Sequence, residues 1–272
     1  MTSHALTAVA LARDPQGIRA LLHDGLGMDV RQHEQEGIGT ALTFAAANGA
    51  VAVVEPAANG PIAGLLGDAP ARWIGTIVGA APDDVEELVR LADAAGTVRV
   101  GIGDGAGTAA VDAPVSIDHV AFAVTDRDAA LAQLGGELTT DEPLGRWEFP
   151  VLGSATAMVP LQRAYLELNE PFRDESLFAA AANTGDGRPV FVVLRVEDVR
   201  AARDRLIAAG HRVADLEDVL ARPERSRAEP APIATVAPIP RREASGLSIM
   251  MLQASWPWSG PADAAASSTR TE

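Results

Sequence analysis

The chain contains no cysteine and no lysine, since all 22 of its basic residues are arginine. Without cysteine it can form no disulfide, no thiolate zinc site and no cysteine nucleophile. Without lysine it can supply no Schiff-base lysine, no lysine general base and no P-loop lysine. Any chemistry must therefore come from other residue types.

Positive charge and long apolar runs are also scarce. The formal net charge is −15, which argues against nucleic acid and anionic membrane surfaces as partners. No apolar run approaches the length that spans a bilayer. The apolar start, residues 1–14, lacks a basic region and a cleavage pattern, so it predicts a strand rather than a signal peptide. We expect a cytoplasmic protein whose partner is a small organic substrate or ligand.

Two segments carry the residues best suited to a site. In SIDHVAFAVTD (116–126), His119 stands within an apolar run that predicts a strand. In AYLELNEP (164–171), Glu167 lies on a strand whose residues alternate with a period of two. A His and a Glu near the middle of two strands are what a small metal site inside a curved sheet needs.

An internal repeat organises the rest of the chain. Residues 50–66 echo 164–180, and residues 6–14 echo both 119–128 and 190–198. Each copy follows a strand, helix and strands pattern, and the Asn-Gly pair at 48–49 predicts a hairpin. The simplest account is an α+β fold of four βαβββ-type modules in two paired domains, each pair forming a curved mixed sheet cup.

The repeat also sets the expected boundaries. We predict an N-terminal module pair over 1–112 without ligand-type residues, a C-terminal pair over 113–258 with the site, and a disordered tail over 259–272. Within these units we predict helices at 14–28, 81–96, 127–134 and 197–210, and short strands near 136–140, 211–215 and 232–237. The Pro- and Arg-rich stretch over 221–240 otherwise predicts a loop or a cover over the site.

The segments around His119 and Glu167 resemble the vicinal oxygen chelate superfamily, which includes glyoxalase I, methylmalonyl-CoA epimerase and ring-cleaving dioxygenases. IDHVAFAVTDRDAA is similar to the family's first-strand motif, and YLELNEP with the FRDESLFAAA that follows is similar to the epimerase branch. The resemblance implies paired modules around one divalent metal, a fold in which dimers are common, and so a possible homodimer.

The resemblance places two of the family's metal ligands on His119 and Glu167. It places the third and fourth ligands on Phe191 and Met250, which cannot bind a metal in that way. Two protein ligands rarely hold a divalent ion by themselves, so the cofactor is either a weakly held divalent metal or none. Phe191 and Met250 instead indicate a drier cup that suits an organic ligand.

Several further residues are candidates for contact with a substrate. Arg146 can clamp a carboxylate, and Trp147 and Phe149 on the same strand can stack on a ring, although packing is the commoner role of such aromatics. Tyr165 and Asn169 share the face of Glu167.

Three functions remain open from sequence. In the first, the chain is an isomerase, epimerase or lyase in which His119 and Glu167 move a proton, directly or through a metal. A ring-cleaving dioxygenase is disfavoured because positions 191 and 250 lack metal ligands. In the second, the chain binds or sequesters a small molecule, such as an antibiotic, without catalysis. In the third, His119 is a core histidine, Glu167 forms a buried salt bridge to Arg163 or Arg195, and no site exists.

Overall fold

A computed structural model describes residues 5–79, 98–102, 113–138, 145–161, 164–185 and 187–254. The predicted helix at 81–96 and the predicted tail at 259–272 lie outside these residues. The N-terminal part contains β1 (Leu6–Ala12), α1 (Gln16–Arg19), η1 (Ala20–Gly25), β2 (Val30–Gln35), β3 (Gly39–Ala46), β4 (Gly49–Pro56), η2 (Ala63–Leu66), β5 (Ala71–Val78) and β6 (Val100–Ile102).

The C-terminal part contains more strands and longer helices. Its elements are β7 (Val115–Ala123), α3 (Arg127–Leu138), β8 (Gly145–Phe149), β9 (Ser154–Pro160), β10 (Tyr165–Pro171), α4 (Ala179–Thr184), β11 (Pro189–Val196), α5 (Val199–Ala208), β12 (Glu217–Pro223), β13 (Ala231–Ile239), η3 (Arg241–Ala244) and β14 (Ile249–Ala254). None of the helices in the described part of the chain has the length and apolarity of a bilayer span.

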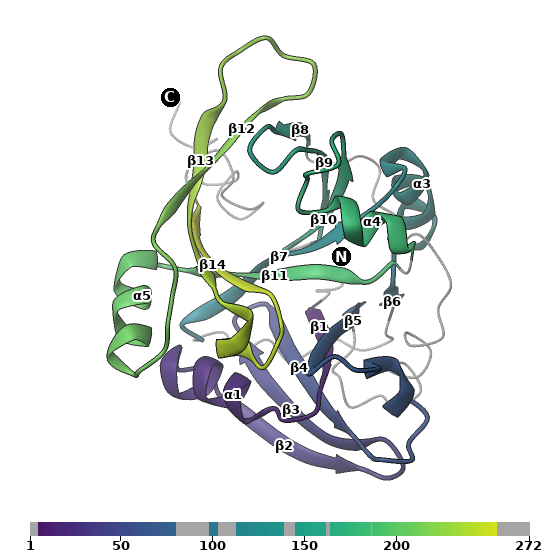
Figure 1. Ribbon diagram of the computed structural model, residues 1–272, viewed down its shortest axis with the longest axis vertical. Helices are drawn as coiled ribbons and strands as arrows, with labels where there is room; N and C mark the ends of the chain where they lie inside the picture. Colours follow the sequence, from purple (N-terminus) through teal and green to yellow (C-terminus); the bar gives the residue numbers. More distant parts are fainter. Residues whose placement is uncertain are drawn as a thin grey trace, which may run out of the picture.

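The strands form two sheet bodies (Figure 1). The N-terminal sheet has the order β2-β3-β4-β1-β5-β6, in which β1 pairs in parallel with β4. The C-terminal strands close into a barrel in the order β10-β7-β11-β14-β13-β12-β8-β9. The barrel closes where β12 pairs with β8, through Arg222 opposite Glu148 and Pro223 opposite Trp147. This architecture confirms the predicted α+β class with two mixed-sheet bodies.

The two bodies share one apolar core. Outward-facing residues of β7, β10 and β11, such as Phe122, Leu166 and Leu194, pack in the same cluster as Phe44 and Trp73 of the N-terminal sheet. Inward-facing residues of β7 and β11, such as Ala121 and Phe191, are buried inside the barrel. Because both faces of β7 and β11 are buried, these two strands are nearly continuous apolar runs, and their few polar residues are conspicuous.

Asn48 ties the N-terminal sheet to the strand that carries His119. It lies in the predicted β3–β4 hairpin turn, and its side-chain amide donates to the carbonyl of Ile117 at 2.6 Å while its oxygen accepts the Ile117 N–H at 2.8 Å. Both backbone groups of Ile117 are therefore satisfied by one buried side chain. The N-terminal sheet thus fixes β7 two residues before His119.

Three element predictions are corrected by the structure. The strand expected near 136–140 is wrong because α3 continues to Leu138. The strand expected at 211–215 is displaced to β12, which begins at Glu217. The loop expected over 221–240 is largely the hairpin of β12 and β13, whereas the strand expected near 232–237 is confirmed as part of β13, which covers Ala231–Ile239.

Candidate functional site

A β-bulge places two polar side chains on the same side of β7. On the neighbouring strand β11, Val193 pairs with His119 and the next residue, Leu194, pairs with Ile117. Asp118 is therefore an extra residue on β7 at this point. A bulge interrupts the strict alternation of a strand, so Asp118 and His119 can both face the barrel interior. Both side chains line the same cavity.

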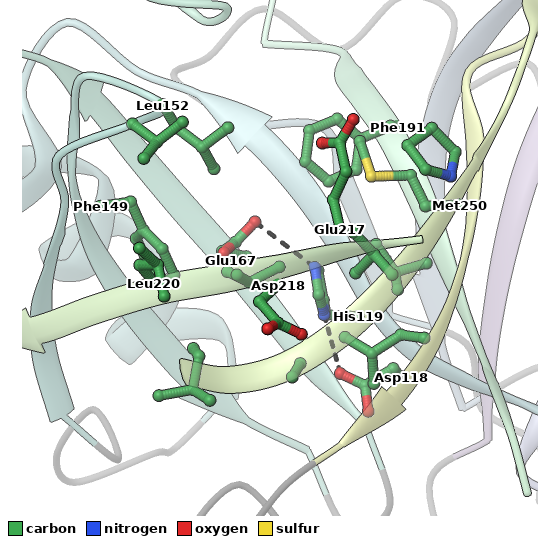
Figure 2. Close-up of a pocket in the computed structure, with 18 of the residues that line it drawn as sticks. Asp118, His119, Phe149, Leu152, Glu167, Phe191, Glu217, Asp218, Leu220 and Met250 are labelled. Atoms are coloured by element: carbon green, nitrogen blue, oxygen red, sulfur yellow. Dashed lines mark hydrogen bonds and ion pairs between the residues drawn. The ribbon is translucent and has the colours of Figure 1, made fainter. Parts of the chain in front are cut away.

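His119 lies between two carboxylates, as Figure 2 shows. Its Nδ1 is 2.8 Å from Oδ1 of Asp118, and its Nε2 is 3.5 Å from Oε2 of Glu167. An ionised carboxylate can only accept hydrogen bonds, so Nδ1 of His119 carries a proton and donates a hydrogen bond to Asp118. Arg195 lies on the far side of Asp118, where its Nε and one terminal nitrogen each lie 2.6 Å from Oδ2. Arg195 thus positions the Asp118 carboxylate, and Asp118 in turn positions the imidazole of His119.

These charges set the protonation of His119. Burial by itself lowers the pKa of His119, but the negative charge of Glu167 and the hydrogen bond and charge of Asp118 outweigh burial, so the pKa is raised above its ordinary value. Burial likewise tends to raise the pKa of Asp118, yet His119 and Arg195 together lower it. The arrangement favours the imidazolium form of His119 and the ionised form of Asp118.

Glu167 is held by a polar cluster on β10 and β9. The side-chain amide of Asn169 donates to Oε2 of Glu167 at 3.0 Å. The oxygen of Asn169 accepts from Thr156 Oγ1 at 2.7 Å and from Ser154 Oγ at 3.3 Å. The contacts of Glu167 with Asn169 and His119 both fall on Oε2. Oε1 takes part in neither of them.

The cavity around this cluster has a volume of about 300 Å³. Most of its wall is apolar and comes from several strands of the barrel: Phe149, Met158, Phe191, Val193, Met250 and Leu252. Glu217 and Asp218 on β12 add two further carboxylates to the lining (Figure 2). Val151 and Leu177 also line the cavity while 70% and 50% exposed, so they mark its mouth. An open mouth and an apolar wall with a few convergent polar groups are typical of a small-molecule site.

The structure brings five of the predicted site residues to this cavity: His119, Glu167, Phe149, Phe191 and Met250. The Phe191 ring meets the His119 ring edge-on, with 6.3 Å between centroids. The apolar residues at positions 191 and 250 therefore do face the His and Glu, as the resemblance implies.

Four predicted substrate-contacting residues lie away from the cavity lining. Arg146 points outward from β8 and pairs with Asp128 at 2.7 Å. Phe149, three positions further along the strand, faces inward, and residues an odd number of positions apart lie on opposite faces. Trp147 packs at the seam with β12 beside Phe149. Tyr165 and Asn169 do share the buried face of Glu167, but neither reaches the cavity, and Asn169 instead supports Glu167.

Sequence reasoning missed four charged residues of the site. Alternation assigns Asp118 to the face opposite His119, and nothing in the sequence signals the bulge. Arg195 was considered only as a partner for Glu167, although an Arg within the apolar run RPVFVVLRV is itself a signal of a buried partner. Glu217 and Asp218 were missed because the strand that carries them was placed too early.

The donor set does not fit a divalent metal. Both imidazole nitrogens of His119 face carboxylates, and the remaining positions expected for ligands are the apolar Phe191 and Met250. Within the described ranges, no group of three or more His, Cys, Asp or Glu residues is arranged to hold a metal ion.

The model of the glyoxalase-like domain matches residues 117–257, slightly more than half of the chain. The chain belongs to the glyoxalase-like domain family. This assignment confirms the resemblance to the vicinal oxygen chelate superfamily that the segments around His119 and Glu167 predict. A search of curated proteins found no match.

Solved structures with similar folds were also found. The methylmalonyl-CoA epimerase of Mycobacterium tuberculosis is 22% identical, with a TM-score of 0.42, over 55% of this chain and 91% of that chain. A variant of the Streptomyces coelicolor methylmalonyl-CoA epimerase in complex with 2-nitronate-propionyl-CoA is 19% identical, with a TM-score of 0.42, over 51% and 96%. A hypothetical protein from Bacillus halodurans is 20% identical, with a TM-score of 0.43, over 52% and 95%. At these identities and scores, the family assignment rests on the domain match.

Proposed function

We propose that this glyoxalase-like protein is an enzyme that moves a proton on a small, largely apolar organic substrate, in the manner of an isomerase or epimerase. One observation carries the proposal: a buried imidazole lies between two carboxylates on the wall of an open apolar cavity. Perturbed titratable groups in a cleft are characteristic of catalytic acids and bases.

His119 is the acid in this proposal. Asp118, itself held by Arg195, fixes the ring, and the charges of Glu167 and Asp118 raise the pKa of His119 in spite of its burial, which favours the protonated ring. The 3.5 Å separation between Nε2 and Glu167 is longer than a good hydrogen bond. A substrate oxygen entering at this point can take the Nε2 proton at a better distance.

Glu167 is the base. The amide of Asn169 orients its carboxylate towards the cavity side of β10. Glu167 removes a proton from a carbon next to a carbonyl group. The C–H electron pair forms a carbon–carbon double bond, the π pair of the carbonyl moves onto its oxygen, and His119 donates its Nε2 proton to that oxygen. Return of a proton to the opposite face of the same carbon, with loss of the proton on oxygen, gives an epimer. In an α-hydroxy ketone, return of a proton to the former carbonyl carbon, with loss of the α-hydroxyl proton, gives an isomer. If the β-carbon bears a leaving group, that group departs with its bonding electron pair and the result is lyase-type elimination.

The test is exchange of carbon-bound protons with solvent. The full chain is incubated in D₂O with a panel of chiral α-substituted ketones, α-hydroxy ketones and thioesters that fit a 300 Å³ cavity, and loss of the α-proton signal is followed by NMR. We expect Glu167→Gln and His119→Gln each to slow exchange by about 10²- to 10⁴-fold, the usual contribution of general acid–base catalysis. Arg200→Ala on the exposed surface of α5 serves as the control. Exchange that is equally fast in Glu167→Gln contradicts the proposal.

The apolar wall supports a second candidate, a protein that binds a small molecule without catalysis. Phe149, Phe191 and Met250 give the cavity more apolar contact than a proton transfer needs. The two functions differ in what His119→Gln and Glu167→Gln change. Loss of turnover with ligand affinity retained supports the enzyme, whereas loss of affinity in a protein with no measurable turnover supports the binding protein.

A further inference from the structure

A second concave surface lies outside the barrel, between the start of β5, the end of β1 and the segment 241–248. It consists of two hollows of about 420 and 580 Å³ that share Ala69, Ala71, Arg241 and Gly246 in their linings. The hollows are therefore contiguous. Neither shares a lining residue with the barrel cavity.

This surface is lined by five arginines, and we refer to it as the arginine groove: Arg13, Arg72, Arg188, Arg241 and Arg242. The acidic residue in its lining is Asp14, and Arg242 also lies 3.5 Å from the carboxylate of Glu243. The chain as a whole has 37 acidic and 22 basic residues, so a groove with five arginines differs in sign from the net charge of the chain. A concave surface lined mainly by one sign of charge concentrates ligands of the opposite sign.

The bonds that orient two of these arginines go to neutral oxygens. Arg13 donates from Nε to the carbonyl of Ala69 at 3.3 Å, and its terminal nitrogen donates to the carbonyl of Gly67. Arg241 donates from Nε to the hydroxyl of Ser248 at 2.7 Å. A carboxylate partner would cancel the positive charge, whereas a carbonyl or hydroxyl fixes the guanidinium and leaves its charge available.

The floor of the groove is closely packed. Gly246 has φ of 108°, and a Cβ at this position would lie 2.8 Å from Cγ of Pro70 and 3.3 Å from the backbone nitrogen of Ala71. The neighbouring Ser245 holds a left-handed conformation with φ of 52°. The contact between 245–246 and 70–71 joins the two hollows, so it fixes the arginines of one relative to those of the other.

We infer that the arginine groove binds a small ligand that carries two or more phosphate groups. Two contiguous hollows with arginines in both suit a ligand with more than one anionic group. The planar guanidinium fork recognises phosphate through two parallel hydrogen bonds, and phosphate brings more charge per group than carboxylate. The strongly negative remainder of the chain argues against a long polyanion such as nucleic acid.

The test is isothermal titration calorimetry of the full chain with inorganic tripolyphosphate at fixed ionic strength. We expect saturable binding, weakened at least 10-fold by Arg241→Ala and by Arg13→Ala. Arg241→Lys, which keeps the charge but loses the fork, should weaken binding as well. Arg200→Ala is the matched control, because Arg200 is an exposed arginine on α5 outside the groove. The thermal unfolding midpoint of each variant shows that it is folded.

Two further titrations identify the source of the anionic groups. Tighter binding of ADP than of pyrophosphate indicates a nucleotide, and equal binding indicates the phosphates alone; both results support the inference. Citrate that binds as tightly as tripolyphosphate would overturn the choice of phosphate. Absence of saturable binding, or an equal loss in Arg200→Ala, would overturn the site itself.

Discussion

Removal of the Asp118 carboxylate should destabilise the protein because His119 and Arg195 both lose their negatively charged partner. Asp118 and His119 are each less than 10% exposed, and the side chain of Arg195 is 27% exposed. Asp118→Ala therefore leaves one buried and one partly buried positive group without their partner. This loss should cost more free energy than the loss of a surface carboxylate, because water can reach the partly exposed Arg195 but not the buried His119.

The expected size follows from that burial. Breaking a buried ion pair by removing one partner costs about 3–5 kcal/mol, and the partial exposure of Arg195 places Asp118→Ala near the lower end, at about 3 kcal/mol. Arg195→Ala leaves Asp118 bonded to His119, so we expect about 2 kcal/mol, the value of a hydrogen bond to a charged group. If most of the stability lost in Asp118→Ala and in Arg195→Ala comes from the one ion pair between these two residues, the coupling energy in the cycle is about 2 kcal/mol.

The measurement is a double-mutant cycle by urea denaturation, followed by tryptophan fluorescence, to which the buried Trp73 contributes. Glu148→Ala with Arg222→Ala forms a matched cycle, since that pair has similar distances of 2.6–2.7 Å but side chains 20% and 33% exposed. We expect its coupling to be about 1 kcal/mol or less. A coupling below about 0.5 kcal/mol between Asp118 and Arg195 would show that the pair is not the support that the geometry indicates.

Three other predictions follow from the site and the fold. The pKa of His119 is raised in the folded state, so the stability that this shift contributes is complete below the ordinary pKa of 6.5 and is lost as pH rises through the raised pKa. The free energy of unfolding should therefore fall above pH 6.5. Urea titrations of His119→Gln should show a weaker dependence on pH. Phe191→His combined with Met250→Glu restores ligand types at two positions in the cavity, and calorimetry should show Zn²⁺ binding at least about 10-fold tighter than in the unsubstituted protein, whereas unchanged affinity would refute the positional match. Gly49→Ala drives a Cβ into the carbonyl oxygen of Leu6 where β1 pairs with β4, and thermal denaturation should show a loss of about 3 kcal/mol or more; a loss under about 1 kcal/mol would contradict the packing.

Local patterns predicted the parts of the fold in which one rule dominates. The apolar run around His119 and the alternation around Glu167 place both residues correctly on β7 and β10. Asn48 and Gly49 predict the β3–β4 hairpin through turn chemistry alone. These features depend on near neighbours in the chain, so the sequence contains what is needed to find them.

The strand near 232–237 is predicted correctly, but its pairing in a hairpin with β12 could not be predicted because the prolines of the stretch point to a loop. Pro223 lies at the end of β12, where the pairing with β8 finishes. Pro232 pairs with Leu220 next to a bulge, because the following pair joins Val219 to Ala234. Proline is tolerated at strand ends and bulges because its missing N–H is not needed there. Only the register of the neighbouring strands shows that these positions are allowed.

The bulge at Asp118 explains how His119 gains a second carboxylate beside Glu167. Without the extra residue, alternation would turn Asp118 to the outer face, and His119 would lose one of the two carboxylates that raise its pKa. Glu167 would then face a less strongly charged ring in an apolar cavity, an expensive position for a carboxylate. Relatives with apolar residues at the positions of Phe191 and Met250 should therefore keep a carboxylate before the His and a cation at the position of Arg195. A family alignment in which these residues vary independently would contradict this reasoning, because the imidazolium would then have no consistent support.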